Sequence, residues 1–122
     1  PKMLKKRREI AKKYDLEFKE LLNIKIQKIP QEVNSGYYAY IMKLKKGNLN
    51  KFRVNLLKKG IETSPMFTTV YKTKAYKKLK EKNNYCPNSE KLDSQTFTIP
   101  LHPGLTYKQM NYVIKEIKNQ DK

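Results

Sequence analysis

The sequence predicts an α+β domain in which helices pack on a small antiparallel sheet of about three strands. Two observations lead to this fold class. Short runs with the apolar pattern of β-strands alternate along the chain with longer runs whose apolar residues recur every three or four positions. The 122 residues suffice for one domain with a modest core, and no apolar run approaches the roughly 20 residues of a membrane helix.

Residues 2–22 are predicted to form a long amphipathic helix. Its apolar residues recur at spacings of three, four or seven and comprise Met3, Ile10, Tyr14, Phe18, Leu21 and Leu22. The pattern starts with the first residues and has no N-cap before it, so we expect further chain to precede this helix. Residues 23–36 are predicted to be irregular, because Asn23, Pro30 and Gly36 interrupt them.

A strand and a second helix are predicted next. Residues 37–44, YYAYIMKL, are aromatic and almost continuously apolar, which indicates a strand with both faces partly covered. Residues 49–59 have the helical pattern, with an N-cap at Asn48 or Asn50 and a left-handed C-terminal position at Gly60. The side chains expected to face inward from this helix are those of Leu49, Phe52, Leu56 and Leu57.

Another strand and two further helices are predicted in the following segment. The strand spans 61–67, IETSPMF, and lies at a sheet edge, because Pro65 has no N–H to donate to a neighbour. A helix over 69–82 would carry on one face Tyr71, Ala75 and Leu79. A short helix over 87–93 begins with Pro87, which suits the first helical turn.

The last strand and the last helix are predicted over 95–101 and 107–118. Thr106 and Gln109 fit a capping box at the start of the helix. The apolar faces consist of Phe97, Ile99 and Leu101 in the strand and of Met110, Val113, Ile114 and Ile117 in the helix.

Residues that could carry chemistry are few. His102, the only histidine, lies at the corner between the last strand and the last helix, and no paired nucleophile and carboxylate accompany it. We interpret it as structural or solvent-facing. The four glycines are too widely spaced for a phosphate-binding loop, and the single cysteine, Cys86, excludes a cysteine-built zinc site. The residues by themselves thus predict no catalytic residue and no metal site, and one cysteine fits a reducing, cytoplasmic compartment.

The net charge of +17, from 28 basic and 11 acidic residues, has two interpretations. It favours nucleic acid or an anionic membrane as a partner, and Tyr37, Tyr38 and Tyr40 could then stack on bases. Alternatively, the lysines fill solvent positions, as in proteins from AT-rich genomes, and the tyrosines fill the core. Only three of the basic residues are arginines, and the basic residues are spread over both halves of the chain, which favours the second interpretation.

Four segments in register resemble the DegT/DnrJ/EryC1/StrS family of pyridoxal-phosphate (PLP)-dependent sugar-nucleotide aminotransferases. They are LKKRREIAKKYDLEF (4–18), SGYYAYIMKL (35–44), LNKFRVNLLKKGIETSPMF (49–67) and CPNSEKLDSQTFTIPLHPGLTYKQMNYVIKEI (86–117). Their order and spacing match the family over essentially the whole chain. The GIETSPMF segment most resembles the perosamine-synthase-like branch.

The resemblance implies the C-terminal small domain of a fold-type-I aminotransferase. Residues 1–36 would be a long helix and linker that join it to a large PLP-binding domain, and residues 37–122 the small domain itself. The lysine and acid that hold PLP belong to the large domain, so the resemblance implies no catalytic or cofactor-binding residue here and no PLP on this chain alone. The whole enzyme is expected to be a cytoplasmic homodimer that makes an amino sugar from a keto-sugar nucleotide and an amino-acid donor, for cell-surface polysaccharide or lipopolysaccharide.

The family pattern near the second predicted strand is roughly GIETRPFFYPLH, where this chain reads GIETSPMFTTVY. By resemblance, the substrate is expected to contact Ser64, Met66, Phe67 and Tyr71. Ser64 replaces an arginine and cannot make its planar, bidentate contact, so either the substrate differs or activity is lost. Two alternatives remain: a stand-alone basic module that binds nucleic acid, and a split subunit that binds a separately encoded large domain through the apolar face of residues 2–22.

Overall fold

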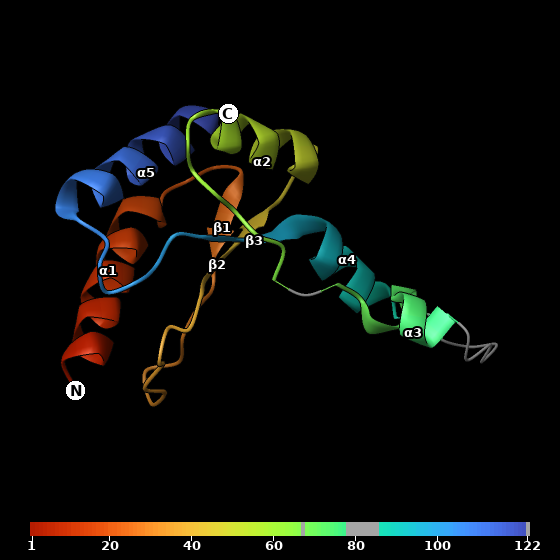
Figure 1. The fold of residues 1–122 in the computed structure, drawn as a ribbon, viewed down its shortest axis with the longest axis horizontal. Helices are drawn as coiled ribbons and strands as arrows, with labels where there is room; N and C mark the ends of the chain where they lie inside the picture. The colour runs from red at the N-terminus through yellow and green to blue at the C-terminus, as the bar shows by residue number, and fades with distance from the viewer. Residues whose placement is uncertain (67, 78–85, 122) are drawn as a thin grey trace.

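The computed structural model describes residues 1–66, 68–77 and 86–121. Along them lie α1 (Lys2–Phe18), β1 (Ile24–Ile26), β2 (Tyr40–Leu44), α2 (Leu49–Lys58), η1 (Val70–Lys72), α3 (Lys74–Lys77), α4 (Pro87–Gln95), β3 (Thr96–Ile99) and α5 (Tyr107–Gln120). Helices α1, α2 and α5 gather on one side of the sheet, whereas the segment with α3 and α4 extends away from it (Figure 1). No helix in the described ranges is long and apolar enough to cross a membrane.

The sheet has three antiparallel strands in the order β1-β2-β3, which confirms the predicted α+β class with a small antiparallel sheet. Side chains alternate between its two faces. Along β2, Tyr40, Met42 and Leu44 are buried, whereas Ile41 and Lys43 between them are half-buried. The buried residues join the core with α1, α2 and α5, and we call the opposite face of the sheet the outer face.

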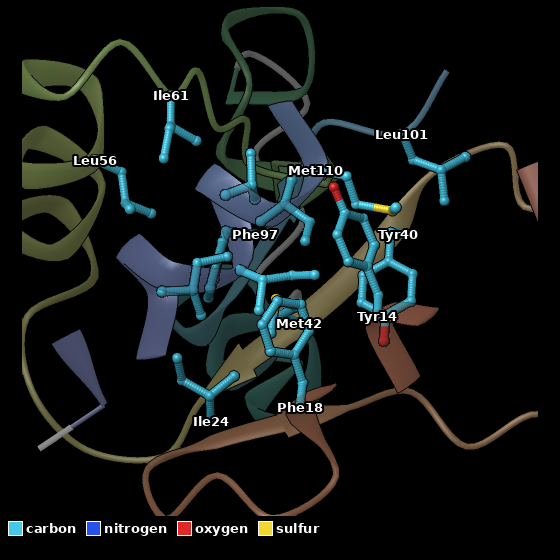
Figure 2. Packing of buried hydrophobic residues seen from close by; sticks show 14 of the residues in the cluster. Tyr14, Phe18, Ile24, Tyr40, Met42, Leu56, Ile61, Phe97, Leu101 and Met110 are labelled. Carbon is cyan, nitrogen blue, oxygen red and sulfur yellow. The ribbon is translucent and has the colours of Figure 1, made fainter. Parts of the chain in front are cut away.

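An aromatic cluster from α1 and β2 lies in the core (Figure 2). The ring centroid of Tyr14 is 5.5 Å from that of Phe18 and 5.0 Å from that of Tyr40. The Tyr14 hydroxyl donates to the Pro100 carbonyl at 2.9 Å, and the Tyr40 hydroxyl donates to the Asp15 carboxylate at 2.7 Å. Burial raises the pKa of both hydroxyls, so both remain donors at neutral pH. Tyr40 is therefore a core residue and cannot stack on a base.

The prediction of a strand over 61–67 is wrong for the described residues. Residues 61–66 meet the sheet at one isolated bridge, in which the Thr98 N–H donates to the Ser64 carbonyl at 2.8 Å. Pro65 follows directly and has no N–H with which to continue the ladder. The third strand is instead β1, within the segment predicted to be irregular. Its three residues are too few to show a period, and pairing with β2 holds them extended.

Helix α1 is shorter than predicted and ends at Phe18. The carboxylate of Asp121, from the far end of the chain, accepts the N–H groups of Leu22 at 2.6 Å and Asn23 at 2.8 Å. These contacts hold the connection to β1 in a non-helical path. Leu22 is 77% exposed and Met3 is 72% exposed, so neither belongs to the apolar face predicted for this helix.

Helix α2 confirms its predicted caps but not every predicted inward side chain. The Asn48 side chain accepts the Lys51 N–H at 2.9 Å, and Gly60 follows the helix with a φ of +75°. Leu57 is exposed, because Leu56 takes the inward position and successive helical residues point about 100° apart. At α5 the predicted capping box is present, and the helix runs two residues past its predicted end.

The segment predicted as a helix over 69–82 begins as a short 3₁₀ turn, η1, followed by α3. Residues 78–82 of that prediction, and with them Leu79, lie outside the described residues. The predicted short helix at 87–93 is α4, which starts at Pro87 as expected and continues directly into β3.

Candidate functional site

A cleft of about 720 Å³ lies between the outer face of the sheet and the segment that carries η1 and α4. Its floor includes Lys25, Gln27, Ile41 and Lys43, and its wall includes Met66, Thr69, Val70, Tyr71, Leu92 and Asp93. Small-molecule sites in proteins span roughly 300–1,000 Å³. The cleft falls within this range and is lined by Met66 and Tyr71 of the predicted substrate set, so we take it as the candidate functional site among the described residues.

The floor carries two lysines side by side. Lys25 of β1 and Lys43 of β2 are direct partners in the antiparallel register, and Lys43 in turn pairs with Thr96 of β3. Both lysines lie on the outer face, because their neighbours Ile24 and Met42 are buried on the other face. Like charges placed directly opposite on neighbouring strands destabilise a sheet.

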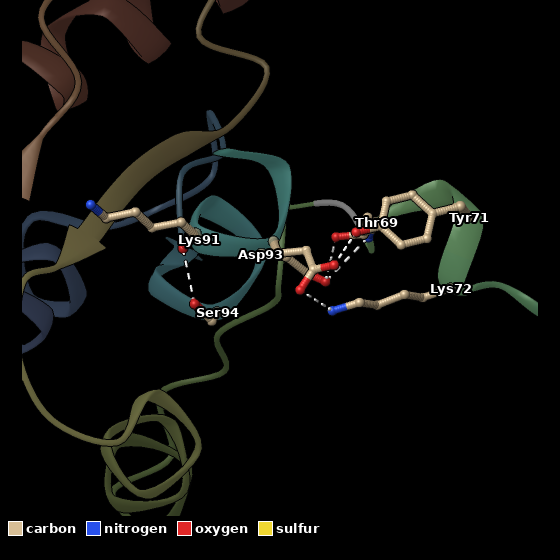
Figure 3. A network of polar contacts seen from close by, with 7 residues as sticks. Thr69, Tyr71, Lys72, Lys91, Asp93 and Ser94 are labelled. Carbon is tan, nitrogen blue, oxygen red and sulfur yellow. Dashed lines mark hydrogen bonds and ion pairs between the residues drawn. The ribbon is translucent and has the colours of Figure 1, made fainter. Parts of the chain in front are cut away.

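Hydrogen bonds to two carboxylates hold η1 against α4 (Figure 3). The Asp93 carboxylate accepts the Thr69 hydroxyl at 2.9 Å and the Thr69 N–H at 3.2 Å. Glu90 accepts the Tyr71 hydroxyl and pairs with Lys72 at 3.3 Å. The bonds from Tyr71 and Lys72 lower the pKa of Glu90, whereas burial and the bond to Glu90 raise the pKa of Tyr71. Both carboxylates are thus engaged in holding the wall in place.

The structure brings together only part of the predicted substrate site. Met66 and Tyr71 both line the cleft. Ser64 does not, because it faces a separate hollow. Phe67 lies outside the described residues. The sequence reasoning missed the lysines of the floor, since Lys25 stands in a segment predicted to be irregular and no local pattern shows that it opposes Lys43.

The separate hollow, of about 470 Å³, is lined by Ser64, His102 and Tyr112 among others. His102 is exposed there, and its carbonyl accepts the Leu105 N–H at 3.0 Å in the turn before α5. Among the hydrogen bonds of the described residues, none involves the His102 ring. His102 therefore lies on a solvent-facing corner, as the sequence predicts, and lacks the partner that would orient a general base.

All three arginines are used to hold loops. The guanidinium groups of Arg7 and Arg8 donate to the carbonyls of Tyr37 at 3.3 Å and Ser35 at 3.0 Å, respectively. Arg53 donates to the Thr63 carbonyl at 2.9 Å and to its hydroxyl at 3.2 Å. The side chains best suited to bidentate phosphate contacts are thus engaged within the fold, and lysines supply the rest of the positive surface.

Neither a metal site nor a PLP site fits the described residues. They contain no group of three or more His, Cys, Asp or Glu side chains that could hold a metal ion. PLP needs a lysine for its Schiff base and an acidic partner for its pyridine nitrogen. Asp93, the carboxylate that lines the cleft, already accepts hydrogen bonds from the N–H and hydroxyl of Thr69. We therefore derive no reaction step through PLP on these residues.

Comparison with known proteins covers nearly the whole chain. Residues 1–118 match the model of the DegT/DnrJ/EryC1/StrS aminotransferase family. An uncharacterised protein of Methanocaldococcus jannaschii, MJ1066, is 29% identical over 121 residues, which are 95% of this chain and 31% of that protein.

Solved structures also match nearly the whole of this chain and about a third of their own length. The putative sugar aminotransferase Spr1654 from Streptococcus pneumoniae, in its PMP form, superposes with a TM-score of 0.89 at 26% identity, over 98% of this chain and 31% of that one. The aminotransferase TlmJ from Streptoalloteichus hindustanus superposes with a TM-score of 0.88 at 23% identity, over 98% and 32%, which is a likeness of fold. The chain thus spans about a third of the length of these relatives.

Proposed function

Because the chain belongs to the DegT/DnrJ/EryC1/StrS aminotransferase family, we propose that it is the C-terminal domain of a PLP-dependent aminotransferase. The reaction would convert a keto-sugar nucleotide into an amino sugar, with an amino acid as the donor. One observation carries the proposal: the family match runs over residues 1–118, while the chain covers only 31% of MJ1066. The remaining two thirds of such a protein would hold PLP, which serves as the electron sink in transamination.

The proposal assigns distinct roles to the two parts of the chain. Residues 1–36, with α1, would connect the large domain, and residues 37–122 would close the substrate site as the small domain. Met66 and Tyr71 would supply part of its wall, since both line the cleft. Ser64, which faces the separate hollow, and Phe67 complete the predicted set. Ser64 in place of an arginine would either change which sugar nucleotide is accepted or abolish activity.

The finer assignments are also part of the proposal. The enzyme would belong to the perosamine-synthase-like branch, act as a cytoplasmic homodimer, and supply amino sugars for cell-surface polysaccharide. On its own, this chain would not transaminate, because the lysine that forms the Schiff base with PLP would lie in the large domain.

The test compares the natural gene product that contains this sequence with the 122-residue chain. Both are mixed with PLP, and the visible absorbance of the bound cofactor is recorded after gel filtration. We expect stoichiometric PLP and keto-sugar amination in a gene product about three times longer, and neither in the short chain. Stoichiometric PLP on the short chain, or a natural product of only this length, would refute the proposal.

The net charge of +17 favours one alternative, binding of nucleic acid by a free-standing module. That alternative predicts affinity for single-stranded RNA that falls steeply as salt concentration rises. Absence of binding at low ionic strength would exclude it. The engagement of all three arginines with loop carbonyls and Thr63 argues against it.

A further inference from the structure

We propose that the outer surface of α1 and α5 binds the surface of an anionic membrane. The partner would be a lipid bilayer with negatively charged headgroups, and no helix would insert into it. The surface is made by lysines of the two helices, and we call it the basic helix face: Lys2, Lys5, Lys6, Lys12, Lys13, Lys108 and Lys115. The inference rests on where these charges lie and does not depend on the proposed transamination.

Each helix carries its lysines on the side that faces away from the core. On α5, the exposed Lys108 and Lys115 lie two turns apart, opposite the fully buried Ile117. Lys5 and Lys12 have the same spacing on α1 and are also exposed. Helices α1 and α5 lie together on one side of the sheet, away from α3 and α4 (Figure 1). The cleft lies on the other side of the sheet, so a membrane bound here would leave it open to solvent.

Contacts between α1 and α5 join the two lines of lysines into one surface. The Lys13 ammonium lies 4.4 Å from the centroid of the Tyr107 ring, and Lys118 pairs with Glu17. Tyr107 is nevertheless 66% exposed, and Met3 at the start of α1 is 72% exposed. The basic helix face therefore combines positive charge with an exposed aromatic side chain and an exposed apolar side chain.

The charge of the basic helix face is not neutralised within the described residues. Their ion pairs use Lys59, Lys72 and Lys118, none of which belongs to it. The acidic residue of residues 2–13 is Glu9, and that of α5 is Glu116, which is buried and paired with Lys59. Basic residues are spread over the whole chain, but on this surface they are almost unopposed.

A membrane surface fits these observations better than nucleic acid or another protein. Arginine makes the bidentate contacts typical of phosphate recognition, and Arg7 and Arg8 are engaged by loop carbonyls. Protein interfaces are depleted in lysine. An anionic bilayer attracts each lysine near its surface without requiring a defined contact geometry. Tyrosine is enriched at the level of the lipid headgroups, where the exposed ring of Tyr107 would lie.

Co-sedimentation with lipid vesicles tests the proposal. The vesicles consist of phosphatidylcholine alone or of phosphatidylcholine and phosphatidylglycerol in equal parts. The 122-residue chain and the natural gene product that contains it are both measured. We expect both to bind the anionic vesicles at least about tenfold more tightly than the neutral ones, with an affinity that falls as salt concentration rises. Failure of either protein to prefer the anionic vesicles would overturn the proposal.

Matched charge variants separate this surface from general attraction. The first variant changes lysines of the basic helix face: Lys6→Gln, Lys12→Gln, Lys108→Gln and Lys115→Gln. The second changes the same number of exposed lysines outside α1 and α5: Lys28→Gln, Lys45→Gln, Lys74→Gln and Lys91→Gln. We expect the first to weaken binding to anionic vesicles at least about tenfold and the second less than about threefold. Equal losses in two folded variants, as judged by dispersed amide spectra, would contradict the assignment.

Two further measurements test the orientation and the class of partner. The chain has no tryptophan, so Tyr107→Trp on the basic helix face and Tyr76→Trp in α3 each introduce a single fluorescent reporter. On anionic vesicles we expect a blue shift of emission for Tyr107→Trp and none for Tyr76→Trp; equal shifts would overturn the proposal. Single-stranded oligouridine is the competitor. If it binds more tightly than the vesicles at equal charge concentration, through the same lysines, the surface binds nucleic acid instead.

Discussion

Tyr40→Phe removes one hydroxyl group from the core and tests the link between α1 and β2. That hydroxyl donates to Oδ1 of Asp15 at 2.7 Å, and Tyr40 is only 3% exposed. A hydrogen bond to a charged group contributes about 1.5–3 kcal/mol, and because Asp15 is half-buried, water can replace part of it, so we expect a loss of about 1–2 kcal/mol. For 122 residues this corresponds to a fall in Tm of roughly 4–8 °C.

Urea and thermal unfolding measure this loss, and two controls isolate its cause. Tyr38→Phe removes a hydroxyl from a side chain that is 83% exposed, and should change the free energy of unfolding by less than about 0.5 kcal/mol. A double-mutant cycle with Asp15→Ala, which removes the acceptor, should return a coupling energy of about 1 kcal/mol. If Tyr40→Phe costs no more than Tyr38→Phe, or if the coupling is zero, this hydrogen bond does not stabilise the fold as argued.

Three other predictions concern stability. The hydrogen bond from Lys59 lowers the pKa of Glu116. This pair should therefore stabilise the fold above the unfolded-state pKa of Glu116 and lose its effect as pH falls through the folded-state pKa. In Glu116→Gln, the urea concentration at the midpoint of unfolding should fall less between neutral and acidic pH than it does in the unmodified chain. Gly60→Ala should cost about 1–2 kcal/mol in chemical denaturation, because φ is +75° there. Lys25→Glu should stabilise the chain by about 0.2–1 kcal/mol, since it turns a like-charge pair with Lys43 into an opposite-charge pair.

Each of these has a matched control. Glu17→Gln removes the more exposed pair with Lys118 and should change the acid limb less than Glu116→Gln does. Gly36→Ala should be tolerated, because Gly36 does not have a positive φ and a Cβ there meets nothing within 4 Å. Equal costs at Gly36 and Gly60 would contradict the argument from backbone conformation. Lys28→Glu, outside the strand pairing, should not reproduce the gain from Lys25→Glu.

Local features of the sequence were sufficient to predict most of the helices. The capping box of Thr106 and Gln109, the Asn48 cap and the glycine after α2 depend on residues within one turn of each other, and all three are present. The apolar period of α5 likewise predicts the side chains that are buried. In contrast, β1 has three residues, and its place depends on contacts with β2 and on Asn23, whose carbonyl accepts the Lys45 N–H at 2.8 Å.

The candidate site was harder to predict from the sequence than the fold, because it is built by contacts between residues far apart in the chain. Resemblance to a family led to Met66 and Tyr71, which line the cleft, but it also led to Ser64, which faces another hollow. The lysine pair of the floor could not be predicted from the sequence, since Lys25 and Lys43 come from separate strands joined by a long irregular connection.

The sequence by itself determined the fold class, the caps of α2 and α5 and the family, because periodicity, caps and segment order can be read along the chain. Only the tertiary structure decided which residues form the third strand, which of the three tyrosines in residues 37–40 enters the core, and which lysines lie opposite each other on the floor of the cleft. The physical reason is that strand pairing and cleft formation join residues far apart in the chain. Which residues pair and which line the cleft depends on the register of the strands, and a shift of one residue would move every side chain of a strand to the other face.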